Sequence, residues 1–196
     1  CRDGTQYMQE YVRGTPKAAI KKIGKCGGAG TAITFQPDPA VFETVHFDWH
    51  RILEHIRQQA YLIPGVRVTI IDERGDETSK DGTLLAPSYT FYFEGGIASY
   101  TIYLNRNQKP KHENVFHVGK EVETPNGRKI HVEAAFQYTD DIAGKEISFA
   151  NNIHTGEGGM HLTGFRTALT RVLNDYARQN DYFKKDDETL TGDDVR

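Results

Sequence analysis

The sequence lacks long hydrophobic runs and has few cysteines, and both absences exclude classes of protein. No apolar stretch approaches the length needed to span a membrane. The first residues, CRDGTQYMQEY, have no apolar signal-peptide core and no initiator Met, so we expect a fragment. The two cysteines, Cys1 and Cys26, lie in no CxxC motif and have no histidine at metal-ligand spacing. We therefore expect two reduced thiols in a cytoplasmic protein, because a disulfide needs an oxidising compartment.

A strong charge bias is also missing. The net charge of −3 argues against a general polyanion binder, although it leaves room for a local basic face. Hydrophobic residues make up 37% of the chain and charged residues 26%, which favours a soluble globular protein over disorder. A length of 196 residues suits one domain, or one domain with a piece of another.

Recognised catalytic and metal-binding motifs are absent as well. The glycine-rich loop 24–30 lacks the GxxxxGK[ST] spacing of a phosphate-binding loop, so we interpret it as a hairpin connection. His46 and His50 could share a helix face, but no Glu lies between them as in HExxH zinc sites. In the acidic tail, Asp193 and Asp194 follow Thr191, which favours helix capping over magnesium binding. The sequence thus predicts no catalytic residue and no metal site.

What the chain does contain is alternating strand patterns and amphipathic helices. The spacing of apolar residues predicts three helices, at 48–62, about 97–104 and 160–179. Period-two alternation and β-branched runs predict strands at 5–12, 20–23, 30–38, 66–71, 89–93, 115–122, 129–138 and 146–151. This order predicts an α+β fold, in which helices pack on one face of a mixed β-sheet.

The longest of these helices follows a glycine-rich turn with Gly158 and Gly159. Its apolar residues fall at helical spacing and predict one buried stripe: Phe165, Ala168, Leu169, Val172, Leu173 and Tyr176. Its polar residues occupy the opposite face: Thr167, Thr170, Arg171, Asn174 and Arg178.

Several short strings, spread along nearly the whole chain, carry a family resemblance. They occur in the order GTAITFQPD, PGVRVTIIDER, FEGGI, YLN, FANNI, EGG, GF, ALTR and TGDD. Together they resemble the transducer region, with the end of the GHKL ATP-binding domain, of the B subunit of bacterial type II DNA topoisomerases. That family comprises the B subunits of DNA gyrase and of topoisomerase IV, which these strings do not separate. Met160 departs from the pattern, because the family usually has Thr there.

The resemblance implies a division into two domains and two residues that contact the adenine of ATP. Residues 1–38 would form the C-terminal strands of the GHKL ATP-binding domain. Residues 39–196 would form the transducer domain, with a left-handed βαβ crossover, truncated before the loop whose lysine reaches the γ-phosphate. Thr31 would hold adenine through its hydroxyl and a water, and Ile33 would line the adenine pocket. The alternative for both residues is an ordinary buried strand.

The resemblance also implies a function for the parent protein. It would be an ATP- and Mg²⁺-dependent type II topoisomerase, in which this region couples ATP binding and hydrolysis to DNA-gate closure and strand passage. Its partners would be DNA, a second B subunit, and the A subunit in an A2B2 assembly. Arg166, Arg171 and Arg178 would face the transported DNA and contact its phosphates; the alternative is solvent-exposed helix arginines.

The isolated chain is expected to be inactive as an ATPase and to hold no tightly bound cofactor. The family's acidic ATP-site helix and Asp-Gly-x-Gly loop do not occur in it, so no residue can act as general base. The main alternative function is a free-standing nucleic-acid-binding or ribosome-associated module of the same fold. That alternative predicts salt-sensitive nucleic-acid binding by the chain alone.

Overall fold

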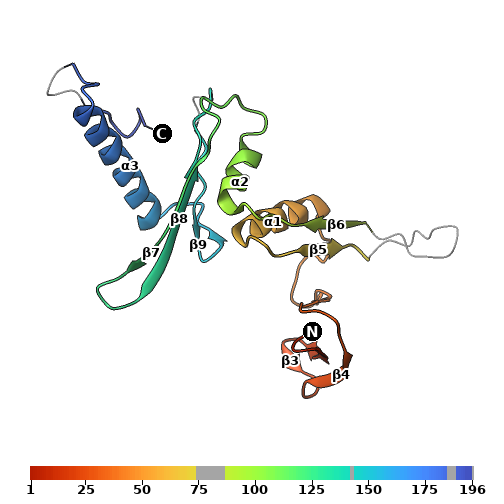
Figure 1. Ribbon diagram of the computed structural model, residues 1–196. Coiled ribbons are helices and arrows are strands. Elements are labelled where there is room, and N and C mark those ends of the chain that lie inside the picture. The colour runs from red at the N-terminus through yellow and green to blue at the C-terminus, as the bar shows by residue number, and fades with distance from the viewer. Residues whose placement is uncertain (74–86, 142–143, 185–188, 196) are drawn as a thin grey trace. The chain divides into compact units, whose positions relative to one another are not determined.

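In the computed structural model the chain forms two units, Cys1–Trp49 and His50–Arg196, each considered by itself (Figure 1). The structure describes residues 1–73, 87–141, 144–184 and 189–195. The domain boundary expected at residue 38 stays a prediction. Within the described ranges, no helix is both long enough and apolar enough to cross a membrane.

The first unit consists of two small antiparallel ladders. β1 (Thr5–Met8) pairs with β4 (Lys21–Lys25), and β2 (Tyr11–Val12) pairs with β3 (Thr15–Pro16). The β2–β3 turn places Arg13 and Gly14 at positive φ, 50° and 78°, which suits a tight hairpin. The strands expected at 5–12 and 20–23 are therefore confirmed in their approximate positions, with a break between β1 and β2.

The strand expected at 30–38 is not formed. Residues 31–38 have no regular secondary structure, and the side chains of Ile33 and Phe35 are 80% and 71% exposed. A strand is stable only beside a hydrogen-bonded neighbour. Among the described residues no strand pairs with this segment, so the strand predicted from its alternating pattern is wrong.

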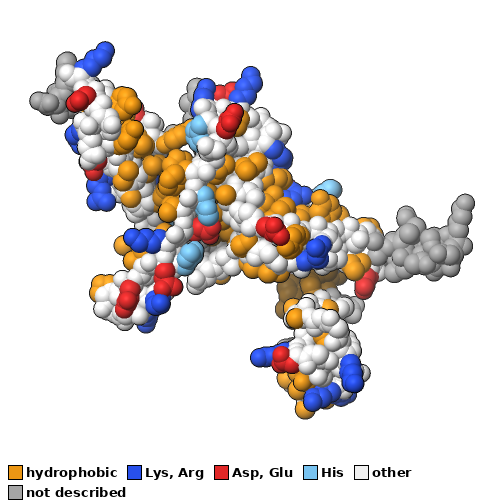
Figure 2. All heavy atoms as spheres, viewed as in Figure 1, with side chains coloured by type: hydrophobic (Ala, Val, Ile, Leu, Met, Phe, Trp, Pro, Cys, Tyr) orange, Lys and Arg blue, Asp and Glu red, His pale blue; other side chains and the backbone are white. Residues whose placement is uncertain are grey.

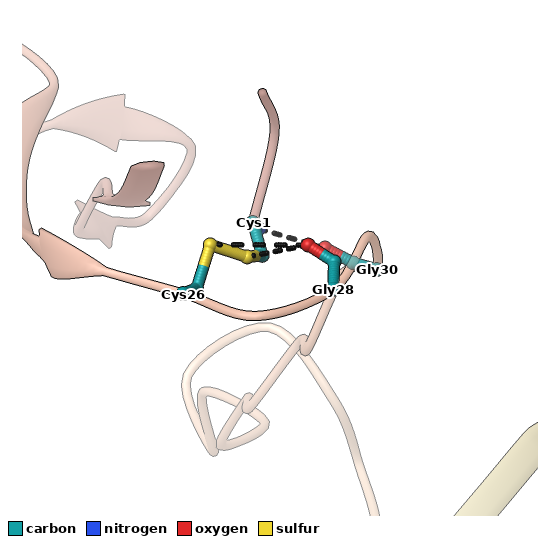
Figure 3. Close-up of a disulfide and its surroundings, with 4 residues drawn as sticks. All are labelled: Cys1, Cys26, Gly28 and Gly30. Atoms are coloured by element: carbon teal, nitrogen blue, oxygen red, sulfur yellow. Dashed lines mark hydrogen bonds between the residues drawn. A yellow bond between two sulfur atoms is a disulfide. The ribbon is translucent and has the colours of Figure 1, made fainter. Parts of the chain in front are cut away.

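The expectation of two reduced thiols is also wrong, because Cys1 and Cys26 form a disulfide (Figure 3). The β1–β4 ladder pairs Thr5 with Lys25 and so draws the two cysteines together. Their Cα atoms are 6.2 Å apart, within the usual disulfide range. The Cys1 ammonium also donates a 2.8 Å hydrogen bond to the carbonyl oxygen of Gly30. Cysteine count and motif spacing gave no information about this proximity.

The second unit begins with a helix–hairpin–helix segment. α1 (Trp49–Leu62) is followed by the antiparallel strands β5 (Val68–Ile71) and β6 (Ser88–Phe91), and then by α2 (Gly96–Leu104). The chain leaves α1 through Gly65, whose φ is 78° and whose N–H donates to the carbonyl oxygen of Phe93 at 2.8 Å. These four elements agree with the predicted positions to within a few residues.

Aromatic side chains form the centre of this segment. The ring of Tyr61 on α1 stacks on Phe93, with 3.6 Å between centroids, and on Tyr100 of α2, with 5.0 Å. Phe91 is only 2% exposed. In Figure 2, hydrophobic side chains gather in the middle of the second unit, while many of its charged side chains lie toward the ends. Aromatic stacking on this scale fixes α1 and α2 against β6.

A long hairpin follows, formed by β7 (Phe116–Glu123) and β8 (Lys129–Phe136). The predicted turn is confirmed: Thr124 and Arg128 exchange hydrogen bonds across it, and Gly127 has φ of 73°. Since side chains alternate along a strand, one face is largely apolar and the other polar. The polar face carries a hydrogen bond between His117 and Glu133 and an ion pair between Lys129 and Glu121, each at 2.7 Å.

A short hairpin joins β9 (Phe149–Ala150) to β10 (Ile153–His154). Its two loop residues, Asn151 and Asn152, have φ of 50° and 65°. Positive φ at both positions is typical of a type I′ turn, which asparagine tolerates better than most residues. The strand predicted at 146–151 is therefore confirmed only in its last residues.

α3 (Met160–Gln179) has the predicted bounds but not the predicted buried face. Phe165, Leu169 and Leu173 turn inward as expected, whereas Val172 and Tyr176 are 57% and 56% exposed.

Asn174, assigned by its polarity to the outer face of α3, is only 8% exposed. It is buried because the tail segment 189–195 docks on the helix, and the Asn174 side chain bonds to the backbone of Leu190. The buried side of α3 therefore includes the polar Asn174 and leaves out Val172 and Tyr176 of the predicted apolar stripe.

The α+β class is thus confirmed, but the sheet arrangement differs from the expectation. The described strands pair as five separate two-stranded antiparallel ladders rather than as one mixed sheet. Since no parallel pair occurs among them, the ladders of the described residues do not display the expected left-handed crossover. Each ladder joins neighbouring parts of the sequence, which is the pairing that short loops favour.

Candidate functional site

The segment with Thr31 and Ile33 is held at both of its ends. At its start, the disulfide and the Cys1–Gly30 hydrogen bond fix the glycine-rich loop (Figure 3). At its end, the Asp38 carboxylate accepts a 2.5 Å hydrogen bond from Arg13 Nε. Between these anchors the Thr31 and Ile33 side chains are exposed, so they are available to a partner group that this unit does not supply.

This segment offers only a part of a nucleotide site. A threonine hydroxyl and an isoleucine side chain suit the polar edge and the flat face of a purine, respectively. However, neither Thr31 nor Ile33 lines the two cavities described below, and the described residues contain no group of three metal-ligating side chains. The residues present therefore do not by themselves fit ATP or Mg²⁺, and we assign no catalytic step to them.

The three arginines predicted to face DNA do not form one cluster. Arg166 is half-buried and makes a two-pronged interaction with the Glu146 carboxylate, through Nε at 2.9 Å and through Nη2. The hydrogen bond from Glu146 raises the pKa of the Arg166 guanidinium. Because its charge is matched by a neighbouring carboxylate, Arg166 is poorly placed to neutralise a phosphate.

Arg171 and Arg178 lie together on the exposed side of α3. They are seven residues apart, which brings side chains back to within about 20° of the same helix face. Arg178 Nη1 lies 3.7 Å from Asp175 Oδ1, a loose exposed pair. For Arg171, no ion-pair partner occurs in the part of the chain that the structure describes.

A shallow groove runs along α3 beside Arg171. Its volume is about 410 Å³, and small or flexible side chains line it: Met160, Thr163, Gly164, Thr167 and Ala168. Small side chains allow a large partner to approach the helix closely, and Arg171 and Arg178 supply positive charge on that same side. The arrangement suits sequence-independent contact with a phosphate backbone.

Two features of the second unit were missed by the sequence analysis. Glu146, which neutralises Arg166, lies 20 residues away in the sequence and could not be paired with it by spacing. A second cavity, beside Arg57 and Arg106, is rich in aromatic residues. The only indication of it in the sequence was the position of Arg57 within the apolar stripe of α1, where a charge is unusual.

Comparison with known proteins places these features in a family. The DNA gyrase B family model matches residues 96–196, which is more than half of the chain. The chain belongs to the DNA gyrase B family. Its resemblance to the type II topoisomerase B subunits is thereby confirmed, and of the two members left open, the match is to gyrase.

Individual relatives agree with this assignment. The chain is 41% identical to the DNA gyrase B protein of Halalkalibacterium halodurans over 196 residues, and 41% identical to that of Thermotoga maritima over 199. All of the chain is covered in both alignments, but only 29% of each relative. The chain therefore spans less than a third of the length of these gyrase B proteins.

A solved structure supports the fold. The chain resembles the crystal structure of the 43K ATPase domain of Thermus thermophilus gyrase B in complex with an aminocoumarin. The TM-score is 0.74 at 27% identity, and the match covers 98% of this chain and 49% of that one. Both units of the chain thus have counterparts in that ATPase domain.

Proposed function

We propose that this chain is the coupling region of the B subunit of an ATP-dependent type II DNA topoisomerase. The observation that carries the proposal is the DNA gyrase B match over residues 96–196, which contain α2, the β7–β8 hairpin and α3. In the proposed role this region passes the effect of ATP binding to the DNA gate as a hinge-type movement.

The proposed partners and cofactors belong to the whole parent protein. They are ATP with Mg²⁺, the transported DNA, a second copy of the B subunit, and the A subunit, in the cytoplasm. Thr31 and Ile33 would contact adenine from the exposed segment between its two anchors. Arg171 and Arg178 are the better candidates for DNA contact, since Arg166 is committed to Glu146.

A chimeric protein tests the coupling role. This chain would replace the matching 29% of the Halalkalibacterium halodurans relative, and the chimera would be assayed with the A subunit of that organism. We expect ATP-dependent supercoiling of plasmid DNA. A folded chimera that hydrolyses ATP without changing DNA topology would contradict coupling by this region.

The DNA-facing helix is tested in the same chimera. Arg171→Gln should weaken stimulation of ATP hydrolysis by DNA several-fold at low salt, and the deficit should shrink at higher salt, because a salt-dependent phosphate contact is lost. Arg128→Gln, in the β7–β8 turn, is the matched control with the same loss of charge. Equal effects of Arg171→Gln and Arg128→Gln would contradict the proposal that α3 faces the DNA.

The isolated chain provides the remaining test. We expect no Mg²⁺-dependent ATP hydrolysis, since no carboxylate in it can be assigned as general base for a water. The free-standing nucleic-acid module predicts tight DNA binding by the chain alone, lost steeply with salt. A gel shift at low and moderate salt separates the two functions.

A further inference from the structure

The second cavity lies between α1, β6 and α2, away from the segment and the helix already discussed. It has a volume of about 530 Å³, within the range of about 300–1,000 Å³ typical of small-molecule sites. Its lining includes Arg57 and Tyr61 of α1, Tyr89 and Phe91 of β6, Tyr103 of α2, and Arg106 just beyond α2. The whole lining has two cations, six aromatic rings and no acidic residue.

The two guanidinium groups converge on one ring. The Cζ of Arg106 lies 4.2 Å from the centroid of Tyr103, and the Cζ of Arg57 lies 5.1 Å from the same centroid. Arg57 Nη1 also donates a 2.5 Å hydrogen bond to the Tyr103 hydroxyl. Both guanidinium groups thus lie near one aromatic ring, and cation–π contacts favour each of them there.

Neither arginine has a carboxylate partner within the ranges that the structure describes. Arg57 is also half-buried, with its guanidinium 5.4 Å from the centroid of the buried Phe91 ring. Arg57 supplies a partly desolvated guanidinium and Arg106 an exposed one, and the planar fork of a guanidinium suits phosphate oxygens. A doubly charged phosphomonoester offsets two guanidinium charges better than a single carboxylate does.

The remaining lining suits a planar ring next to that phosphate. Tyr89 is exposed on β6 and stands beside Phe91, with 4.6 Å between ring centroids. Its free face can stack on an aromatic base, as tyrosines do in single-stranded nucleic-acid sites. The Tyr61 hydroxyl is a hydrogen-bond donor at neutral pH, since its ordinary pKa of 10.0 is raised further by burial.

We propose that the cavity binds a nucleoside 5′-monophosphate group, with the phosphate on Arg57 and Arg106 and the unpaired base on Tyr89. The group can belong to a free mononucleotide or to the 5′-phosphorylated end of a nucleic-acid strand. This site is separate from Thr31 and Ile33 and from the exposed arginines of α3. It does not depend on the coupling role proposed above.

The test is titration of the purified chain with guanosine 5′-monophosphate, followed by calorimetry and by NMR of the tyrosine rings. We expect shifts of the Tyr89 and Tyr103 ring resonances, with a Kd below about 1 mM. Guanosine without phosphate, and ribose 5-phosphate without a base, should each bind about tenfold more weakly or worse. Equal binding of phosphotyrosine would overturn the base-stacking part, and no binding of the nucleotide would overturn the proposal.

Variants locate the site. Arg106→Gln, at an exposed position, should weaken binding about tenfold, because one charge-assisted contact is lost. Arg57→Gln should do the same if the aromatic cluster persists, which the ring resonances report. Arg128→Gln removes an equal charge from the distant hairpin turn and should have no effect. Equal weakening by Arg106→Gln and Arg128→Gln would overturn the assignment.

Two oligonucleotides distinguish the sources of the ligand. If a short 5′-phosphorylated strand binds more tightly than the free nucleotide, the strand end is the ligand. If the free nucleotide binds more tightly than the strand, the mononucleotide is the ligand. A 5′-hydroxyl strand of the same sequence should bind worse than its phosphorylated counterpart. Equal binding of the phosphorylated and the 5′-hydroxyl strand would mean that the cavity binds internal phosphodiesters, and would overturn the proposal.

Discussion

The side chain of Asn174 pairs with the backbone of Leu190 in both directions. Its Nδ2 donates to the Leu190 carbonyl oxygen at 2.9 Å, and its Oδ1 accepts the Leu190 N–H at 2.7 Å. The same Nδ2 lies 2.9 Å from the carbonyl oxygen of Thr170, one turn earlier in α3. One buried amide therefore connects the long helix to the tail that follows it.

Replacing this amide should release the tail. Asn174→Ala leaves the Leu190 N–H and carbonyl without their side-chain partner, which we expect to cost about 1–3 kcal/mol. Hydrogen exchange at the Leu190 amide should accelerate accordingly. Thr163→Ala, on the exposed side of the same helix, is the control and should leave this exchange unchanged. An Asn174→Ala chain with a still-protected Leu190 amide would show that other contacts hold the tail.

The tail should also respond to acid. Thr191 donates two 2.7 Å hydrogen bonds to Asp194 Oδ2, from its hydroxyl and from its backbone N–H. These bonds lower the pKa of the Asp194 carboxyl from its ordinary value of 3.8. The resulting stabilisation is present above the unfolded-state pKa and is lost as the pH falls through the lower folded-state pKa.

Two substitutions at position 191 check this dependence. Thr191→Ala should raise the pKa of Asp194 toward the ordinary value, because the hydroxyl bond is the larger cause of the shift. Thr191→Ser keeps that hydroxyl and should leave the pKa low. Carbon-detected NMR titration of the Asp194 carboxyl measures both. Identical titration curves for the two variants would contradict the assigned cause.

Two substitutions at one residue of the β9–β10 turn should affect thermal stability in different directions. Asn152 has φ of 65°, where glycine is unstrained and a β-branched residue costs about 1–2 kcal/mol. Asn152→Gly should therefore be neutral or stabilising in thermal unfolding, and Asn152→Val destabilising. The hydrogen bond from Gln59 Nε2 to the Asn152 carbonyl, at 3.0 Å, is kept in both variants. If both variants melted together, backbone strain would not govern this turn.

Reduction of the disulfide should loosen the first unit. The cross-link spans 25 residues in sequence, and closing a loop of that size stabilises the folded state by about 3.5 kcal/mol in the chain-entropy model. Amides of the β1–β4 ladder should exchange faster after reduction. Cys26→Ser should reproduce the effect and make the chain insensitive to reductant.

A thiol titration provides the independent check of that bond. The denatured, unreduced chain should react with no thiol reagent, and the reduced chain should react at both Cys1 and Cys26. Two reactive thiols before reduction would instead support the expectation drawn from the sequence.

The elements that the sequence predicted well are those set by local patterns. The bounds of α3 and of the β7–β8 turn follow from helical spacing and from Asn126-Gly127, which act over a few residues. The family assignment followed from short strings in the right order. None of these needed knowledge of distant contacts.

The failures all involve partners far apart in the chain. Residues 31–38 alternate like a strand but lack a neighbouring strand. Asn174 has a polar side chain suited to a surface, yet the tail buries it. Cys1 and Cys26 meet only because of the ladder between them. Likewise, Arg57 and Arg106 converge through the packing of two helices, which no periodicity encodes.

The docking of the tail has a mechanical consequence. Leu190 is bonded to α3 through Asn174, and the carbonyl oxygen of Val195 accepts a 2.9 Å hydrogen bond from the Tyr138 hydroxyl, which follows β8. A pull applied at Val195 is therefore divided between the helix and the hairpin, rather than peeling the chain from either one alone. Force applied along the tail is therefore transmitted both to α3, through Asn174, and to the end of β8, through Tyr138.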